Sequence, residues 1–413
     1  MRMKNREVLI SGAGVAGPTL AYWLLQNGMK PVIVERSPAF RAGGYIVDFW
    51  GVGFDVAERM GLVPELEALG YRNDFAIFVD RKGRRRSGIG GETLRRVLGD
   101  RFLSILRGDL ALLIYQKLEG GVETIFGDEV TDIVPQKDSV RVDFRRSPAR
   151  TFELVIGADG LHSGVRRAAF GKKAGSTRYL GYHAAVFITE GYSRRDEHTY
   201  LSFALPGRQV SRFTLRDGKT GFLFVFSWPD EELSFYRTTE RRKILLRDIY
   251  AGDGWEEWPE IERHLAAASD LYFDSVSQVE LPRWSKDRVA LVGDAAYCPS
   301  LLAGEGAAFA MAGAYILANE LGRATDHAQA FLEYERKFRP FILRKQKAAR
   351  NFAKSFTPST SLGLVVRDVV LKLGAVPPIG DFLVRHFIVD DYAVPEYGPA
   401  PGAMLSSLAK RAG

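Results

Sequence analysis

The first forty residues carry a pattern of apolar and polar positions that predicts a strand, a turn and a helix. Residues 8–10 form a short apolar run, and residues 20–25 place apolar side chains at helical spacing. Pro18 falls in the first turn of the expected helix, where its missing N–H removes only a donor without a helical partner. Gly28 stands where a glycine commonly ends a helix, and a second apolar run follows at residues 31–34.

Three glycines between the expected strand and helix point to dinucleotide binding. Gly12 permits a tight turn, Gly14 lets a pyrophosphate approach the backbone, and Gly17 lets helix and strand pack closely. Glu35 ends the second apolar run, near the roughly 20-residue offset at which such sites place a ribose-binding acid. The pattern therefore predicts a dinucleotide at the positive end of the helix, and leaves open whether it is FAD or NAD.

Two later segments repeat the order of strand, glycine and acid. They are residues 154–160 (LVIGADG) and residues 288–294 (RVALVGD). The second continues into a glycine loop at residues 304–306 and then into small residues over 307–321, which we expect to form a helix.

Residues 177–274 have the alternating pattern of antiparallel strands. Turns are expected at Pro206-Gly207 and at Asp217-Gly218, so the segment predicts a second, sheet-rich domain. Its aromatic side chains are candidates for lining a pocket, with ordinary sheet core as the alternative for most of them; they are Phe187, Tyr200, Phe203, Phe213, Phe222, Phe224 and Phe226. By position, Phe187, Arg212 and Phe224 are the substrate contacts that we select for testing.

Composition narrows the classes of function. The 413 residues are 46% apolar, with 57 Lys and Arg against 50 Asp and Glu, a formal charge of +7. The basic residues are dispersed except at residues 81–86, which resemble the solvated tip of a hairpin after residues 75–79; attraction of a phosphorylated cofactor is the alternative, and nucleic-acid binding is not expected. No apolar stretch reaches membrane-spanning length, and the polar start leaves no room for a signal peptide, so we expect a cytoplasmic protein. Histidine spacing and the single Cys298 predict no metal site.

The three motifs, with a fourth at residues 105–110 (ILRGDL), resemble in order and separation those of the class A flavoprotein monooxygenases. The resemblance spans roughly residues 7–345. Within that family the chain is most similar to the tetracycline-inactivating flavoenzymes, through residues 16–23 (AGPTLAYW), 41–44 (RAGG) with Asp48, and 293–300 (GDAAYCPS).

The resemblance implies an α/β protein with a Rossmann-like FAD-binding domain, an inserted antiparallel sheet and C-terminal helices. The expected ranges are 1–74, 98–180 and 275–325 for the FAD-binding domain, 75–97 and 181–274 for the substrate-binding sheet, 326–392 for bridging and lid helices, and 393–413 for an irregular tail. The first C-terminal helix would bridge the domains and the rest would close over the substrate entrance. A membrane-surface role for residues 362–389 is an alternative that we rank below this one.

The resemblance also implies the residues that contact FAD. Glu35 would take the adenosine ribose, Arg107 would reach the diphosphate or the ribityl chain, and Asp294 would accept hydrogen bonds from the ribityl hydroxyls. Asp159 would lie behind the cofactor, with Arg166 as its expected partner. The full set is Gly12, Gly14, Val15, Ala16, Gly17, Glu35, Arg36, Gly43, Gly44, Arg107, Val130, Asp159, Asp294, Gly304, Gly306 and Ala307, with Pro299 added to the substrate candidates.

The glycine loop departs from the family pattern, in which proline commonly replaces Leu301, glutamine replaces Glu305, and asparagine stands near Ala307 or Ala308. Glu305 matters most, because a carboxylate near a reduced flavin repels its negative charge unless it is protonated, paired or turned outward. No motif residue supplies a general base for a phenol, so catalytic residues stay unassigned.

The implied activity is NAD(P)H-dependent hydroxylation of an aromatic or polyketide-like molecule, with tetracyclines as one possibility, through a flavin C4a-hydroperoxide formed from dioxygen. NADH or NADPH would bind transiently, since one complete glycine-motif unit is present. The alternatives are a FAD-dependent reductase or dehydrogenase without oxygen insertion, and a homologue that binds flavin or ligand without turnover. The chain is expected to be a monomer or a homodimer.

Overall fold

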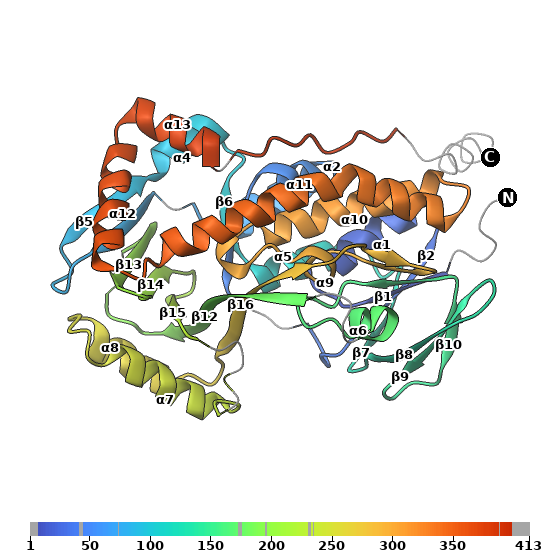
Figure 1. Cartoon of the computed structure of the whole chain (residues 1–413), viewed down its shortest axis with the longest axis horizontal. Helices are drawn as coiled ribbons and strands as arrows, with labels where there is room; N and C mark the ends of the chain where they lie inside the picture. Colours follow the sequence, from blue (N-terminus) through green and yellow to red (C-terminus); the bar gives the residue numbers. More distant parts are fainter. Residues whose placement is uncertain are drawn as a thin grey trace.

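The computed structural model describes residues 7–398, apart from residues 41–43, 73, 172–175, 195, 230–232, 234 and 388 (Figure 1). One domain is built on a sheet with strand order β17-β18-β11-β1-β2-β7, parallel except for β17. Their bounds are β1 Glu7–Ser11, β2 Lys30–Glu35, β7 Glu123–Phe126, β11 Leu154–Gly157, β17 Ser285–Lys286 and β18 Val289–Leu291. The apolar runs predicted from sequence are thus neighbours in one sheet.

Helices and a small sheet bury both faces of this parallel sheet, which explains its nearly unbroken apolar strands. Helices α1 (Ala16–Gln26), α10 (Gly306–Arg323) and α11 (His327–Phe356) pack together, and the antiparallel strands β8, β9 and β10 share the same apolar core. Those strands span Val130–Pro135, Val140–Phe144 and Arg150–Phe152.

A second sheet has the strand order β16-β12-β15-β14-β13-β4-β5. Its bounds are β4 Phe75–Val79, β5 Arg85–Gly90, β12 Ser176–Glu190, β13 Thr199–Leu205, β14 Arg208–Thr214, β15 Lys219–Ser227 and β16 Tyr272–Glu280. Helices α7 (Thr239–Tyr250) and α8 (Trp258–Ala267) cover one face. The other face meets α11 and residues 301–302, so it is turned toward the parallel-sheet domain. The hairpin predicted around residues 81–86 is confirmed as the β4–β5 connection.

The remaining elements connect and cover these sheets. They are β3 Ile46–Phe49, β6 Leu103–Leu106, α2 Gly51–Arg59, α3 Val63–Leu69, α4 Gly91–Leu98, α5 Arg107–Gln116, α6 Gly164–Phe170, α9 Asp294–Tyr297, α12 Ser361–Gly374, α13 Pro377–Phe387 and a 3-10 helix at Leu301–Ala303.

The C-terminal elements run along both domains (Figure 1). After α12 and α13, which lie over β5 and α4, residues 389–398 return along α2. Arg59 donates to the carbonyl oxygens of Val394 and Pro395, and Asp390 accepts from the Val52 N–H at 3.1 Å. Within the described residues, no helix has the length and apolar character to cross a membrane, and no group of three or more metal-ligating side chains is found.

Candidate active site

The turn between β1 and α1 can be built only with glycine at two of its positions. Gly12 has φ +110°, and a Cβ there would lie 2.5 Å from the Ala158 carbonyl oxygen. A Cβ at Gly17 would overlap the carbonyl of Gly12, because α1 passes close to the turn. Gly14 has a different setting: its Cβ would point toward the Arg107 guanidinium at 3.2 Å, so the bare backbone leaves space in front of that charge.

Glu35 is held at the same turn. Its Oε2 accepts from the Ala13 N–H and its Oε1 from the Ser37 N–H, each at 2.8 Å. The carboxylate therefore lies at the end of β2, where a ribose beside the glycine turn would meet it, and the neighbouring Arg36 is exposed.

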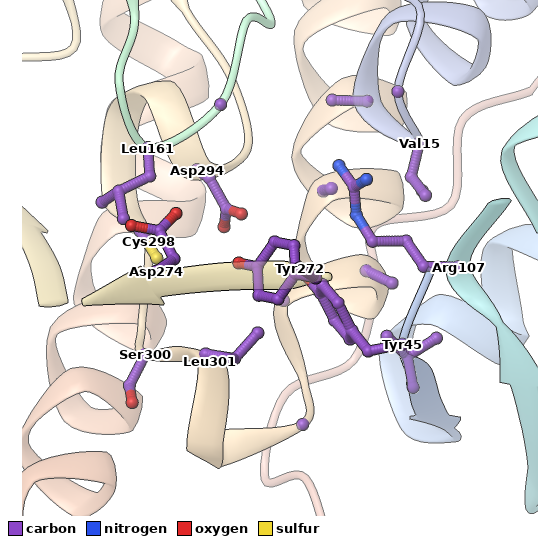
Figure 2. Close-up of a pocket in the computed structure, with 18 of the residues that line it drawn as sticks. Val15, Tyr45, Arg107, Leu161, Tyr272, Asp274, Asp294, Cys298, Ser300 and Leu301 are labelled. Atoms are coloured by element: carbon purple, nitrogen blue, oxygen red, sulfur yellow. The ribbon is translucent and has the colours of Figure 1, made fainter. Parts of the chain in front are cut away.

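A hollow of about 860 Å³, partly open to solvent, lies between the glycine turn, the N-terminus of α10 and strand β16 (Figure 2). Arg107 and Tyr45 line one side of it, while Asp274, Asp294 and Cys298 line the other, with Tyr272 between them. Of the residues predicted to bind cofactor, those that line the hollow are Gly14, Val15, Ala16, Arg107, Asp294, Gly304, Gly306 and Ala307.

Arg107 provides the positive charge of the hollow. It follows β6, whose pairing with β3 sets it beside Tyr45, and its guanidinium lies 6.0 Å from the centre of that ring. The Tyr45 and Tyr272 rings are 5.1 Å apart. Burial raises the pKa of Tyr45 to about 12, against the opposing effect of Arg107, and burial raises the pKa of Tyr272 well above its usual value. Both phenols are therefore neutral hydrogen-bond donors at pH 7.

Asp294 is the acid of the third sequence motif and begins the short helix α9. Burial raises the pKa of its carboxyl, while Arg107 acts in the opposite direction. The thiol of Cys298 lies beside it, and burial raises the pKa of that thiol well above its usual value. Cys298 is therefore a packed, unreactive group here.

Glu305 is paired. Its Oε1 lies 2.6 Å from the Nζ of Lys345 on α11, and the same Nζ lies 2.7 Å from Asp390. Burial raises the pKa of Glu305 to about 7, despite the opposing effect of Lys345. The sequence required this carboxylate to be protonated, paired or turned outward if it lies near a reduced flavin. In the structure Glu305 is paired with Lys345, and its raised pKa also favours the protonated form.

These residues fit an FAD molecule. The bare backbone at Gly14 opens toward Arg107, and the N-termini of α1 and α10 bring unpaired backbone N–H groups to the same hollow. Anionic phosphates and a reduced flavin ring are the chemical groups that such positive helix ends favour.

Comparison with known proteins identifies the family. A model described as the FAD binding domain matches residues 5–346. A flavin-dependent monooxygenase of Legionella longbeachae is 34% identical over 89% of this chain and 92% of its own length. The protein is a member of the class A flavoprotein monooxygenase family.

Two other known proteins are similar to this family member over most of its length. An uncharacterised protein of Mycobacterium tuberculosis is 39% identical over 83% of the chain and 92% of its own length. The crystal structure of the tetracycline destructase Tet(55) superposes with a TM-score of 0.82 and 29% identity, covering 96% of this chain and all of that one.

The second motif of this monooxygenase differs from expectation in one pairing. Asp159 does not bind Arg166; it accepts from the Ser163 hydroxyl at 2.5 Å and from the N–H groups of Gly164 and Val165. The Arg166 guanidinium donates instead to the carbonyls of Leu161 and Ala295. Asp159 therefore stabilises the first turn of α6, because its carboxylate accepts from N–H groups that lack helical partners.

The predicted substrate contacts lie on the wrong face of the sheet. Phe187 and Phe224 stack on each other at 5.9 Å and pack against α7 and α8. Arg212 is buried on the same face, where Glu257 accepts from it at 2.8 Å. The prediction that these three residues contact the substrate is therefore wrong. Successive side chains of a strand point to opposite faces of the sheet, so a choice that is one residue off selects the wrong face.

Four other expected residues either do not line the hollow or fall outside the described residues. Val130 is buried at the start of β8, and Pro299 accepts from Gln278 at 2.5 Å through its carbonyl. Gly44 has φ +97° with open space around it, whereas Gly43 falls outside the described residues.

The sequence reasoning missed Tyr45, Tyr272 and Asp274. Tyr272 and Asp274 are two residues apart on β16. An alternating pattern in the segment before the 288–294 motif was the sequence signal that could have indicated this strand and its residues. Asp274 also accepts from His162 at 3.1 Å, which joins the sheet domain to the loop after Asp159.

Proposed function

We propose that this protein is an NAD(P)H-dependent FAD monooxygenase that hydroxylates an aromatic or polyketide-like small molecule. The observation that carries the proposal is one hollow lined both by the dinucleotide turn and by the inward face of the sheet. The tetracycline destructase Tet(55), which shares the whole architecture, makes a tetracycline-type antibiotic a reasonable first candidate.

The chain's own groups would hold the cofactor. The N-terminus of α1 would face the pyrophosphate and Glu35 the ribose, while Arg107 and Asp294 would contact the diphosphate and ribityl region. The backbone N–H groups at the start of α10 would lie at the pyrimidine edge, where the helix dipole favours negative charge. When bound, FAD would supply the redox chemistry, with electrons from NADH or NADPH and with dioxygen as the oxidant.

Tyr272 and Asp274 are two of the residues of β16 that a substrate in the hollow would meet, beside Ser275 and Ser277. The Tyr272 hydroxyl remains protonated at neutral pH, so it would donate a hydrogen bond to a substrate oxygen. The Asp274 carboxylate would accept from a substrate hydroxyl, with His162 holding its orientation from the other domain. These two residues would orient the substrate ring and share its hydroxyl proton.

The alternatives of a reductase or a non-turnover homologue depended on the altered glycine loop. In the structure Glu305 is compensated by Lys345, so the loop does not present an unpaired negative charge to a reduced flavin. This pairing favours the monooxygenase over both alternatives.

The test uses purified, FAD-loaded protein, NADPH or NADH, and ¹⁸O₂ with a panel of phenols and tetracyclines. We expect a panel member to accelerate NAD(P)H oxidation and to gain one ¹⁸O atom, as measured by mass spectrometry. A reduced product without ¹⁸O would establish the reductase. Ligand binding without NAD(P)H oxidation by any panel member would establish the non-turnover homologue.

A further inference from the structure

Helices α12 and α13, with the turn between them, carry a group of exposed apolar side chains. It consists of Leu362, Val365, Val366, Val369, Val370, Leu373, Val376, Ile379 and Phe382, and we name it the α12–α13 apolar face. These are nine of the eighteen large apolar side chains that are exposed in the described part of the chain. Leu362 is 73% exposed and Phe382 64%. A single-molecule surface rarely leaves such a group of side chains in water without a partner.

The orientation of α12 is fixed by its opposite face. Asp368 accepts from the Ser87 hydroxyl at 2.8 Å and pairs with Arg86 at 3.0 Å, which ties the helix to β5. The Arg367 guanidinium lies 3.6 Å from the centre of the Phe78 ring. Leu364 and Asp368 are one turn apart and buried, so the exposed group points away from the sheet.

The surroundings of this face are strongly basic. Strand β5 packs against α12, and α4 packs against α13. Residues 85–98, which form β5 and α4, contain together with residues 361–387 seven Lys or Arg and three Asp or Glu, an excess of four in a chain whose formal charge is +7. More than half of the net charge of the protein therefore lies on the elements that carry and border its exposed apolar face.

We propose that the α12–α13 apolar face docks on an anionic lipid surface. Apolar side chains with a basic border match the acyl boundary and the negative headgroups of such a surface. A second copy of the chain fits less well, because a symmetric contact through α12 would bring two basic borders together. The last described residue, Gly398, is bonded to Arg323 at the end of α10, far from this face (Figure 1).

The test is cosedimentation of the FAD-loaded full chain with vesicles of phosphatidylcholine alone or mixed equally with phosphatidylglycerol. We expect binding to the mixed vesicles that weakens with salt and is at least about tenfold weaker without phosphatidylglycerol. Val366→Asp with Val369→Asp should lower binding at least about tenfold, and Arg85→Glu with Lys372→Glu, at exposed basic positions of β5 and α12, should also lower it. Leu332→Asp with Leu343→Asp, at exposed positions of α11, is the matched control and should bind like the parent.

Each variant changes exposed side chains, so flavin absorbance and circular dichroism should be unchanged. Equal binding by the apolar-face variant and its control would overturn the proposal. Absence of vesicle binding would also overturn it, and sedimentation velocity without lipid would then reveal a second copy as the occupant if a dimer dissociates on Val366→Asp with Val369→Asp.

Discussion

Glu305 shows how a single side chain is defined by partners that are distant in sequence. The loop motif identified it as a negative charge at the start of α10, and Lys345 and Asp390 lie 40 and 85 positions away along the chain. Residue spacing could predict the glycine loop, because its backbone demands are local. It could not predict the ion pair, because that contact depends on how α11 and residues 389–398 are placed.

This burial has a consequence for pH dependence. The pKa of Glu305 rises to about 7 on folding, so the folded chain binds its proton more tightly than the unfolded chain does. The contribution of this group to stability is therefore complete below about pH 4.5 and declines as the pH rises to about 7. Glu305→Gln should gain about 1–3 kcal/mol of unfolding free energy relative to the parent between pH 5 and pH 8. Urea denaturation at saturating FAD measures it, and the exposed Glu67→Gln should show no such trend.

Arg107 is the residue whose loss should most affect cofactor affinity. A hydrogen bond from a charged donor is worth about 1.5–3 kcal/mol, so Arg107→Ala should raise the dissociation constant of FAD at least about tenfold. Quenching of FAD fluorescence on titration of the FAD-free protein measures the constant. Arg101→Ala is the control, because Arg101 is exposed and bonds to Asp55 and Glu58. An unchanged constant in Arg107→Ala would remove Arg107 from the cofactor site.

At the scale of elements, α10 works because it is made of small residues. It is buried along nearly its whole length between α1, α2 and α11, which approach it closely. A Cβ on Gly313 would overlap the Tyr297 hydroxyl and lie 3.2 Å from the Phe338 ring. The sequence predicted a helix of small residues over 307–321, which α10 confirms, and the small side chains are what allow its neighbours to pack so closely.

Gly313→Ala should therefore destabilise the fold by about 1–3 kcal/mol, since the core would have to move to accept one methyl group. Thermal unfolding followed by circular dichroism provides the measurement. Gly374→Ala, at the end of α12, is the matched control, because its Cβ would meet only the tip of Leu383 at 3.4 Å. Equal melting temperatures for the two variants would contradict this account of the packing.

For the second sheet, the sequence predicted the antiparallel strands well but predicted poorly which side chains face the hollow. Alternation indicated antiparallel strands, yet both faces of β13, β14 and β15 carry apolar side chains. Phe224 faces α7 and α8, whereas Phe213 and Tyr200 stack on the opposite face. The alternation of residues along a strand could not show which face of the sheet is turned to the hollow. One face is buried under helices and the other under another domain, and both kinds of burial favour the same apolar residue types.

For the whole molecule, the contact between His162 and Asp274 is the point where the two domains meet beside the hollow. The hydrogen bond to Asp274 raises the pKa of His162. A histidine with a raised pKa stabilises the fold fully below its unfolded value near pH 6.5, and this contribution is lost as the pH rises through the folded value. Because the His162 side chain is 60% exposed, the effect should stay below about 1 kcal/mol.

His162→Gln should accordingly lower the free energy of unfolding at pH 6 and leave it nearly unchanged at pH 8.5. Urea denaturation at both values, repeated in about 1 M salt, checks the sign and the screening. His386→Gln, at an exposed histidine outside this contact, is the control. A loss of equal size at both pH values would show that the ring acts by packing and that its charge has no part.

The two walls of the hollow are synthesised at different times, and this order has a consequence for when FAD can bind. The backbone at residues 304–307 is made nearly three hundred residues after the glycine turn at residues 12–17. Asp390, which bonds to Val52, comes later still. Chains leave the ribosome from the N-terminus, so a nascent chain would present its glycine turn long before the opposite wall of the hollow exists. Loading of FAD therefore belongs to the last stage of translation or follows release.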